Sequence, residues 1–169
     1  AAAFSLLVST FQPLVFRLAF RLLCDEDEAK DMVQETFVKV WLALGKYNGE
    51  CRFSTWIYKI TCNTCYDRLR SLYHSPLDNE ADYSVSVNIS SDDNVELAVV
   101  NKQLRELILR YTDELSPRQR LIFTLRDIEE LDVPEVQTIT GLSAGIIKTT
   151  LYLARKNIRN KMNQIDAGL

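Results

Sequence analysis

Aromatic, amide and cationic side chains alternate along one short stretch of the chain. Between residues 46 and 70 they are Lys46, Tyr47, Arg52, Trp56, Tyr58, Lys59, Asn63, Tyr66, Arg68 and Arg70. Aromatic rings can stack on exposed bases while cations hold phosphates, so this mixture suits unpaired nucleic acid. The alternative is an amphipathic helix whose aromatic residues are buried and whose charges are solvated.

Two helices must position these residues. One is expected after Asp25, which can cap a helix, and Glu26, Asp27 and Glu28 suit the positive end of the helix dipole. At about 100° per residue, its core face comprises Ala29, Met32, Val33, Thr36, Phe37, Val40 and Leu44. Off this face, beside Asp31, lie Gln34, Val38, Trp41 and Leu42. Exposed apolar groups of this size indicate either a covering helix of the same domain or a partner protein.

The second helix is expected over FSTWIYKITCNTCYDRLR, capped by Ser54 or Thr55. A further amphipathic helix is expected over residues 1–23, bent near Pro13, to pack on the helix after Asp25. Arg17 and Arg21 lie one turn apart on it. Solvated charge is favoured for both over a place on the polymerase- or DNA-facing side. The chain begins with Ala1, so residues are expected before it.

Helical periodicity is lost over residues 73–94. This segment contains no Lys or Arg, carries five acidic residues and is rich in Ser and Asn. Such a composition predicts a flexible acidic linker. It divides the chain into an N-terminal domain, residues 1–72, and a C-terminal domain, residues 95–169.

Start and stop signals in the C-terminal domain predict a helix-turn-helix. Ser116 precedes Pro117, Asp132 precedes Val133 and Pro134, Gly141 ends a short helix, and Ser143 caps the last one. On that last helix Ile147, Leu151, Ala154 and Ile158 share the core face, whereas the opposite side carries Lys148, Thr149, Tyr152, Lys156 and Arg159. Residues 148–161 contain Lys and Arg but no acid, which is typical of a DNA-facing helix. The alternative is an ordinary helical hairpin.

Composition sets limits on the whole chain. Few Gly and Pro residues and no alternating β-branched run predict an all-α fold. A net charge of −3 means that nucleic-acid contacts must use local patches. No segment is expected to have the continuous apolar length of a membrane span. A single His and the lack of a phosphate-binding Gly loop or paired-carboxylate cleft argue against an enzyme.

The cysteines are expected to be structural. Cys62 and Cys65 lie one helical turn apart, but no second ligand pair accompanies them, and a redox dithiol would sit at a helix N-terminus. Small buried hydrophobes in a reducing cytoplasm are therefore favoured over a metal site.

These motifs together resemble a known family. The segments DEDEAKDMVQETFVKVW and FSTWIYKITCNTCYDRLR look like the second conserved region of bacterial sigma factors of the extracytoplasmic-function (ECF) group. The segment LSPRQRLIFTLRDIEELDVPEVQTITGLSAGIIKTTLYLARKNIR is similar to the fourth region. The last helix of the family commonly contains T-V-K-S-R-L-x-R-A-R, and here Thr150 and Leu153 replace two arginines. The first helix of the motif also departs from the family pattern, with Glu135-Val136-Gln137 in place of an acidic residue, Ile and Ala.

The resemblance implies a sigma factor without cofactor, metal or catalysis, acting in the cytoplasm. It implies that core RNA polymerase binds Asp31, Gln34, Phe37, Val38 and Trp41. The start-proximal promoter element would be contacted by Lys46, Tyr47, Arg52, Trp56, Lys59, Asn63 and Arg68, with Tyr47 and Asn63 around a flipped base. The upstream element would meet Lys148, Thr149, Tyr152 and Lys156. A membrane-associated anti-sigma factor is the expected inhibitor, and no direct membrane insertion is expected.

Two other classes of protein remain possible on the residues alone. One is a free-standing helix-turn-helix regulator with an N-terminal sensing domain, which would bind duplex DNA without polymerase. The other is an interaction protein or metal-responsive sensor built on the Cys62 pair, which would contain stoichiometric zinc.

Overall fold

A computed structural model describes residues 2–73, 102–103, 106, 109–112 and 114–168. All regular elements in these ranges are helical. They are α1 (Ala2–Leu23), α2 (Glu26–Ala43), the 3₁₀ turn η1 (Leu44–Lys46), α3 (Phe53–Tyr73), α5 (Pro117–Phe123), the π-helical turn η2 (Thr124–Ile128), α6 (Val133–Thr140) and α7 (Ala144–Ala167). Part of residues 102–112 is also helical. The predicted linker, residues 73–94, lies outside the described residues except for Tyr73.

The first three helices form a bundle around the face predicted for α2. The Asp25 carboxylate accepts the Glu28 backbone N–H at 2.9 Å, as its capping role requires. The core face of α2 is buried from Ala29 to Val40, against Val15 of α1 and Ile57 of α3. Helix α1 runs on through Pro13, and α3 begins at Phe53, one or two residues before the caps expected from the sequence.

The last three helices form the predicted helix-turn-helix, and local hydrogen bonds explain their ends. Ser116 and Asp132 each close a capping box, with Gln119 and Glu135 respectively. Gly141 adopts a left-handed conformation (φ 74°) that ends α6, and the Ser143 side chain caps α7. The core face of α7 is buried at Ile147, Leu151 and Ala154, while Ile158 is half-buried.

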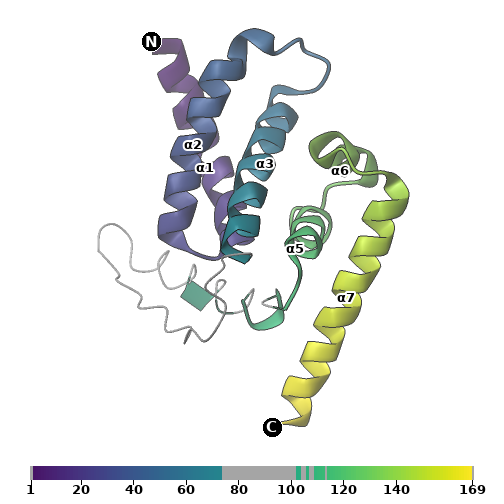
Figure 1. Ribbon diagram of the computed structural model, residues 1–169. Helices are drawn as coiled ribbons and strands as arrows, with labels where there is room; N and C mark the ends of the chain where they lie inside the picture. Colours follow the sequence, from purple (N-terminus) through teal and green to yellow (C-terminus); the bar gives the residue numbers. More distant parts are fainter. Residues whose placement is uncertain (1, 74–101, 104–105, 107–108, 113, 169) are drawn as a thin grey trace.

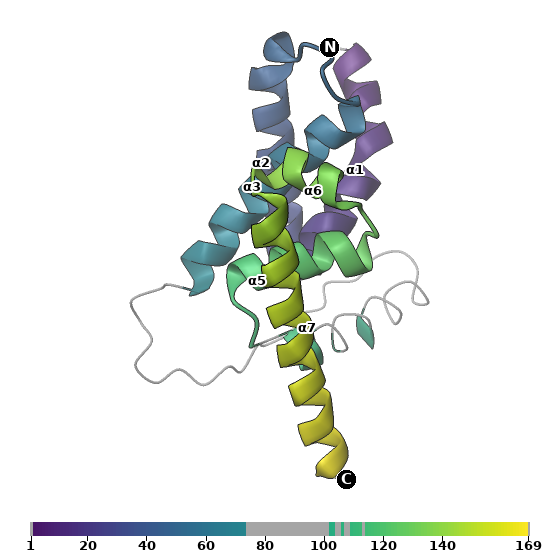
Figure 2. The ribbon, with the colours of Figure 1, turned by 90° about the vertical axis from the view of Figure 1, so that its right-hand side faces the viewer.

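The C-terminal helices lie directly on the N-terminal bundle. In two perpendicular views α5 and α6 lie between α3 and α7, and α7 extends past the rest of the described chain (Figures 1 and 2). One continuous hydrophobic cluster joins the two units: it contains Leu18, Leu22, Cys62 and Leu69 from the bundle together with Leu121, Leu125, Val136 and Ile139. The two helical units therefore share a core.

Helix α1 corrects one expectation from the sequence. It is long and apolar enough to cross a membrane by length and composition, whereas no such segment was expected. In the structure Val15, Leu18, Ala19, Leu22 and Leu23 pack into the core. This packing accounts for the apolar second half of α1, whereas none of residues 2–14 is buried in the structure.

A pair of glycines provides a test of the turn before α7. An added Cβ would meet open space at both Gly141 and Gly145, so only backbone preferences should matter. We expect Gly141→Ala to lower the free energy of unfolding by about 1–2 kcal/mol, because its left-handed φ disfavours a side chain. Gly145→Ala, inside α7, should raise the free energy by about 0.5–1 kcal/mol. Urea denaturation of both variants checks the signs, and equal effects would contradict the turn geometry.

Candidate nucleic-acid interface

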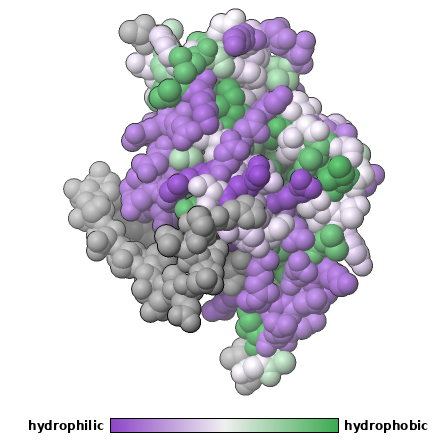
Figure 3. Space-filling model, viewed as in Figure 1, coloured by the Kyte–Doolittle hydropathy of each residue, from purple (hydrophilic) through white to green (hydrophobic). Residues whose placement is uncertain are grey.

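An apolar groove lies between α1 and α2, on the side of α2 away from the bundle core. It has a volume of ≈ 450 Å³ and is lined by Phe4, Val8, Gln12, Val33, Gln34, Phe37, Val38, Trp41 and Leu42. Val38, Trp41 and Leu42 are more than half exposed, and Phe4 packs edge-on against the Trp41 ring at 4.7 Å. Hydrophobic surface gathers at this end of the molecule, where α1 begins and α2 ends (Figure 3). Among the described helices, none covers these side chains.

Four of the five side chains that were predicted to bind polymerase line this groove in the structure. Gln34, Val38 and Trp41 are exposed, and Phe37 forms part of its floor although it is almost fully buried. Asp31 is exposed one turn before Gln34 on α2 and does not line the groove. The groove is thus a preformed apolar surface with an acidic residue near it.

The aromatic residues before α3 and in its first turn form a compact cluster. The Tyr47 ring lies 5.2 Å from the Phe53 ring and 5.3 Å from the Trp56 ring, and the Tyr47 hydroxyl donates to the Cys51 carbonyl at 2.7 Å. These contacts hold the loop between η1 and α3 against the helix. The aromatic cluster therefore holds the Tyr47 and Trp56 rings side by side.

Polar side chains continue this cluster along one exposed ridge of α3. Lys59 and Asn63 are exposed and lie three and seven positions after Trp56, so they follow it on the same side of the helix. Lys46 and Arg52 are also exposed at the two ends of the preceding loop. Trp56, Lys59 and Asn63 thus place a ring, a cation and an amide on one side of α3, which suits a strand of unpaired nucleic acid.

Arg68 lies apart from this ridge. Its guanidinium makes two hydrogen bonds of 2.6 Å to the Glu28 carboxylate, on the side of α3 that faces α2. This hydrogen bonding to Glu28 raises the pKa of Arg68. We predicted from the sequence that Arg68 contacts a phosphate. The pairing with Glu28 could not be seen there, because Glu28 is 40 positions away in the chain.

A basic hollow lies against α7, on the side of Lys148. It has a volume of ≈ 620 Å³ and is lined by Arg126, Val133, Ile147, Lys148, Leu151, Tyr152, Arg155, Lys156, Arg159 and Asn160. Arg155 makes a bidentate ion pair with Asp127 of η2. No described residue forms an ion pair with Lys148, Lys156 or Arg159, so these cations are available to phosphates. Thr149 is exposed on the adjoining strip of α7.

The two residues that depart from the family pattern occupy different positions on α7. Leu153 is exposed next to Thr149 and Lys156, while Thr150 is half-buried farther toward the core side. At about 100° per residue, Leu153 lies about a quarter turn from the centre of the basic strip and Thr150 nearly half a turn. Only Leu153 borders the proposed DNA-facing side.

The four cysteines are free, and those in α3 are buried. Burial raises the pKa of Cys65 to about 12 and raises the pKa of Cys62. The thiolate that metal binding or redox exchange needs is therefore disfavoured at both. Among the described residues, no group of three or more His, Cys, Asp or Glu side chains could hold a metal ion.

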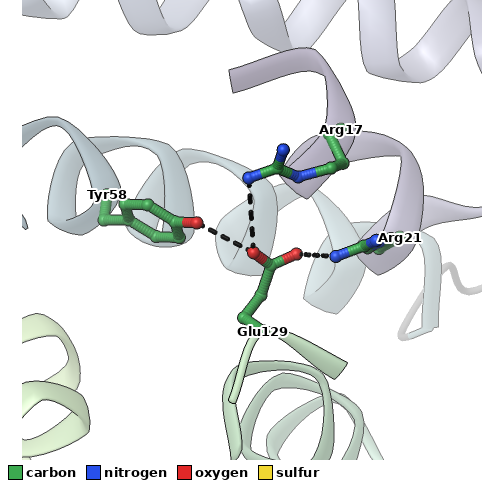
Figure 4. Close-up of polar contacts among 4 residues, drawn as sticks. All are labelled: Arg17, Arg21, Tyr58 and Glu129. Atoms are coloured by element: carbon green, nitrogen blue, oxygen red, sulfur yellow. Dashed lines mark hydrogen bonds and ion pairs between the residues drawn. The ribbon is translucent and has the colours of Figure 1, made fainter. Parts of the chain in front are cut away.

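Sequence reasoning missed one buried polar cluster. Glu129 follows the π-helical turn η2, and its side chain is only 4% exposed. Its carboxylate accepts hydrogen bonds from Arg21 of α1 and from the Tyr58 hydroxyl of α3, the latter at 2.8 Å, and Arg17 lies 3.7 Å away (Figure 4). Arg21, expected to be solvated, is thus largely buried. Helical spacing shows that Arg17 and Arg21 share a face, but it carries no information about a partner 108 positions away.

Tyr58 acts as a neutral donor in this cluster. Burial, and after it the hydrogen bond to Glu129, raise the pKa of Tyr58 to about 12. The hydroxyl stays protonated in the folded protein at any physiological pH, and the ion pair with Arg21 satisfies the carboxylate charge. The cluster therefore connects α1 and α3 to the residue that follows η2.

Comparisons with known proteins agree with a fold of two helical units, the second of which is a helix-turn-helix. The chain matches the family Sigma-70 region 2 over residues 7–74 and the family Sigma-70, region 4 over residues 105–158. It is 30% identical to the ECF RNA polymerase sigma-E factor of Escherichia coli K12, over 96% of this chain and 88% of that protein. The RNA polymerase sigma-H factor of Pseudomonas aeruginosa is 28% identical, over 92% of this chain and 84% of that protein. The chain belongs to the ECF sigma factors, which are transcription-initiation proteins and not enzymes.

Solved structures share this fold. CnrH, in complex with the cytosolic domain of CnrY, superimposes with a TM-score of 0.66 at 20% identity, covering 96% of this chain and 89% of that one. The sigma factor RpoE of Bartonella quintana, in complex with the anti-sigma factor NepR, superimposes with a TM-score of 0.66 at 21% identity. The match covers 96% of this chain and 98% of that one.

Proposed function

We propose that this ECF sigma factor binds core RNA polymerase through the groove between α1 and α2. The exposed Trp41, together with Gln34 and Val38 on the same side of α2, carries this proposal. A solvent-exposed apolar groove of this kind is typical of a protein interface, and a large aromatic residue in it is a common energetic centre. Asp31 would add a charged contact beside the groove.

The α3 ridge would then bind the start-proximal promoter element as a single strand. Tyr47 and Asn63 would contact a flipped base, Trp56 would support strand separation, and Lys46, Arg52 and Lys59 would hold phosphates. Arg68 contributes indirectly in this proposal, because its pairing with Glu28 fixes α3 against α2.

The last helix would enter the major groove at the upstream element. Lys148, Thr149, Tyr152 and Lys156 form the exposed strip that would contact bases and phosphates. The proposed domain boundaries are residues 1–72, 73–94 and 95–169, with the middle segment as the connection. The sigma factor would act in the cytoplasm without inserting into the membrane, and a membrane-associated anti-sigma factor would hold it inactive.

Run-off transcription with purified core polymerase on a genomic promoter library tests the function as a whole. Transcripts that start at shared two-element promoters, and only when the chain is added, would support it. The rival reading, a free-standing helix-turn-helix regulator, predicts tight duplex binding without polymerase. It has no support from the N-terminal unit, which matches sigma-70 region 2.

The groove gives the first functional prediction. We expect Gln34→Ala combined with Trp41→Ala to weaken holoenzyme assembly at least about tenfold, since hot-spot residues contribute about 2 kcal/mol or more. Its unfolding free energy should change by less than about 1 kcal/mol, because both side chains are exposed. Leu6→Ala, an exposed apolar change outside the groove lining, is the matched control. Intact assembly with a large stability loss would contradict the proposal.

The α3 ridge gives the second. Asn63→Ala should impair open-complex formation on duplex promoters far more than polymerase binding, because the amide is assigned to an unpaired base. A template with a pre-opened, mismatched start-proximal bubble should restore part of the activity. Ser71→Ala, exposed two turns later on α3, is the control and should behave as wild type on both templates. Equal defects on duplex and bubble templates would contradict a role in strand opening.

The position of Leu153 gives the third. Leu153→Arg should steepen the salt dependence of upstream-element binding by about one phosphate equivalent and increase guanine preference at the facing base. Thr150→Arg, half-buried on the far side of α7, is the matched control and should change the slope little. Electrophoretic mobility shifts of the holoenzyme across a salt series measure both. A steeper slope for Thr150→Arg alone would show that the opposite side of α7 faces DNA.

A further inference from the structure

Two branched apolar side chains on the first half of α7 are exposed to solvent. Ile146, in the first turn, is 43% exposed and Leu153 is 42% exposed. They are seven positions apart, so two turns bring them to the same side of the helix. Neither belongs to the hydrophobic clusters of the described chain, and neither lines the basic hollow. Packing within the described part of the chain therefore does not explain these two residues.

The same two residues adjoin the surface of α7 that would face DNA. At about 100° per residue, Thr149 lies between the basic strip and this apolar pair, so the three form one continuous exposed surface. Both apolar residues lie in the N-terminal half of the helix. In a helix-turn-helix, that half of the second helix reaches the edges of the bases in the major groove.

Side chains that could read a base by two hydrogen bonds are scarce on this half of α7. Such contacts use Arg or Lys for guanine, Asn or Gln for adenine, and Asp or Glu for cytosine. Residues 144–154 contain none of these except Lys148, which lines the basic hollow. The next candidate is Arg155, whose guanidinium already makes two hydrogen bonds to the Asp127 carboxylate. Hydrogen bonding therefore gives this surface little power to choose among bases.

Thymine offers a group that matches the apolar pair. Its C5 methyl lies in the major groove, where the edges of the other three bases carry hydrogen-bonding groups only. An aliphatic side chain that covers this methyl removes apolar surface of both partners from water. The exposed Ile146 and Leu153 thus have a chemical counterpart on DNA that they would lack on a guanine or cytosine.

We propose that this chain selects its upstream element through thymine methyl groups, which Ile146 and Leu153 contact in the major groove. The inference rests on the proposed function, because it needs α7 in that groove, and it adds which feature of the DNA is read. The two side chains are about 10 Å apart along the helix, at 1.5 Å per residue. They therefore meet different base pairs, and two separate thymines are read.

Replacement of thymine by uracil tests this directly, because it removes the C5 methyl and leaves every hydrogen-bonding group in place. The probe is the strongest promoter from the run-off library, made as a synthetic duplex with deoxyuridine at one upstream-element thymine at a time. Wild-type holoenzyme should lose about fourfold in affinity at two positions, the value for one buried methyl group at each. Competition mobility shifts against the unmodified duplex measure the ratio.

Variants of the chain assign each methyl group to a side chain. Ile146→Ala and Leu153→Ala should each weaken binding to the thymine duplex, and each should abolish the uracil effect at one of the two positions. Ala is the best helix former, so neither change should disturb α7. Met162→Ala is the matched control, because Met162 is 44% exposed on the C-terminal half of the same helix. It should keep both uracil effects and the wild-type affinity.

The possible failures have separate signatures. Wild-type binding that is insensitive to uracil at every position, or uracil effects that persist in both variants, would overturn the inference. Loss of holoenzyme assembly in either variant would assign this surface to polymerase and would overturn it too. If wild-type holoenzyme does not distinguish the upstream element from unrelated duplex, the proposed function fails as well. Specific binding without a methyl effect overturns only the inference drawn from Ile146 and Leu153.

Discussion

Helix α3 has to satisfy three different environments along its 21 residues, and the rest of the structure depends on that constraint. One side, including Ile57 and Thr61, packs into the N-terminal bundle, and a second, including Cys62 and Leu69, supports the C-terminal helices. The third carries Lys59 and Asn63 into solvent. A helix used in this way has few positions left that tolerate substitution. This explains why uncharged side chains that can be buried, such as Thr and Cys, alternate with aromatic and cationic ones.

The charges of this chain act locally, through individual ion pairs and one strip of exposed cations. The net charge is −3, yet three cations along one side of α7 have no acidic partner in the described part of the chain. Other arginines are neutralised internally: Arg68 by Glu28, Arg155 by Asp127 and Arg21 by Glu129. Pairing removes these arginines from the set available to phosphates and leaves a smaller, better-defined basic strip. Overall charge says little about nucleic-acid binding here, because the arrangement of pairs decides which cations face outward.

Much of the fold could be predicted because its signals are local. The caps at Asp25, Ser116, Asp132 and Ser143, and the left-handed Gly141, each depend on residues within about four positions, which the sequence displays directly. The buried face of α2 and the position of Trp41 outside it also follow from helical spacing, whereas spacing left open whether another helix covers Trp41. The pairing of Arg68, the burial of Arg21 and the role of Glu129 could not be predicted, because each depends on a partner 40 or more positions away. The candidate surfaces were therefore found from sequence, and the contacts between the units were not.

The location of Glu129 has a consequence for the order in which the chain is made. Its partner Arg21 is synthesised 108 residues earlier, so the contact between them has a high sequence separation and can form only after most of the chain has left the ribosome. Until then the flank of α3 that carries Cys62 and Leu69 lacks its cover and exposes apolar surface to water. During translation the N-terminal bundle therefore passes through a stage in which this flank is accessible to chaperones and to any partner that recognises it.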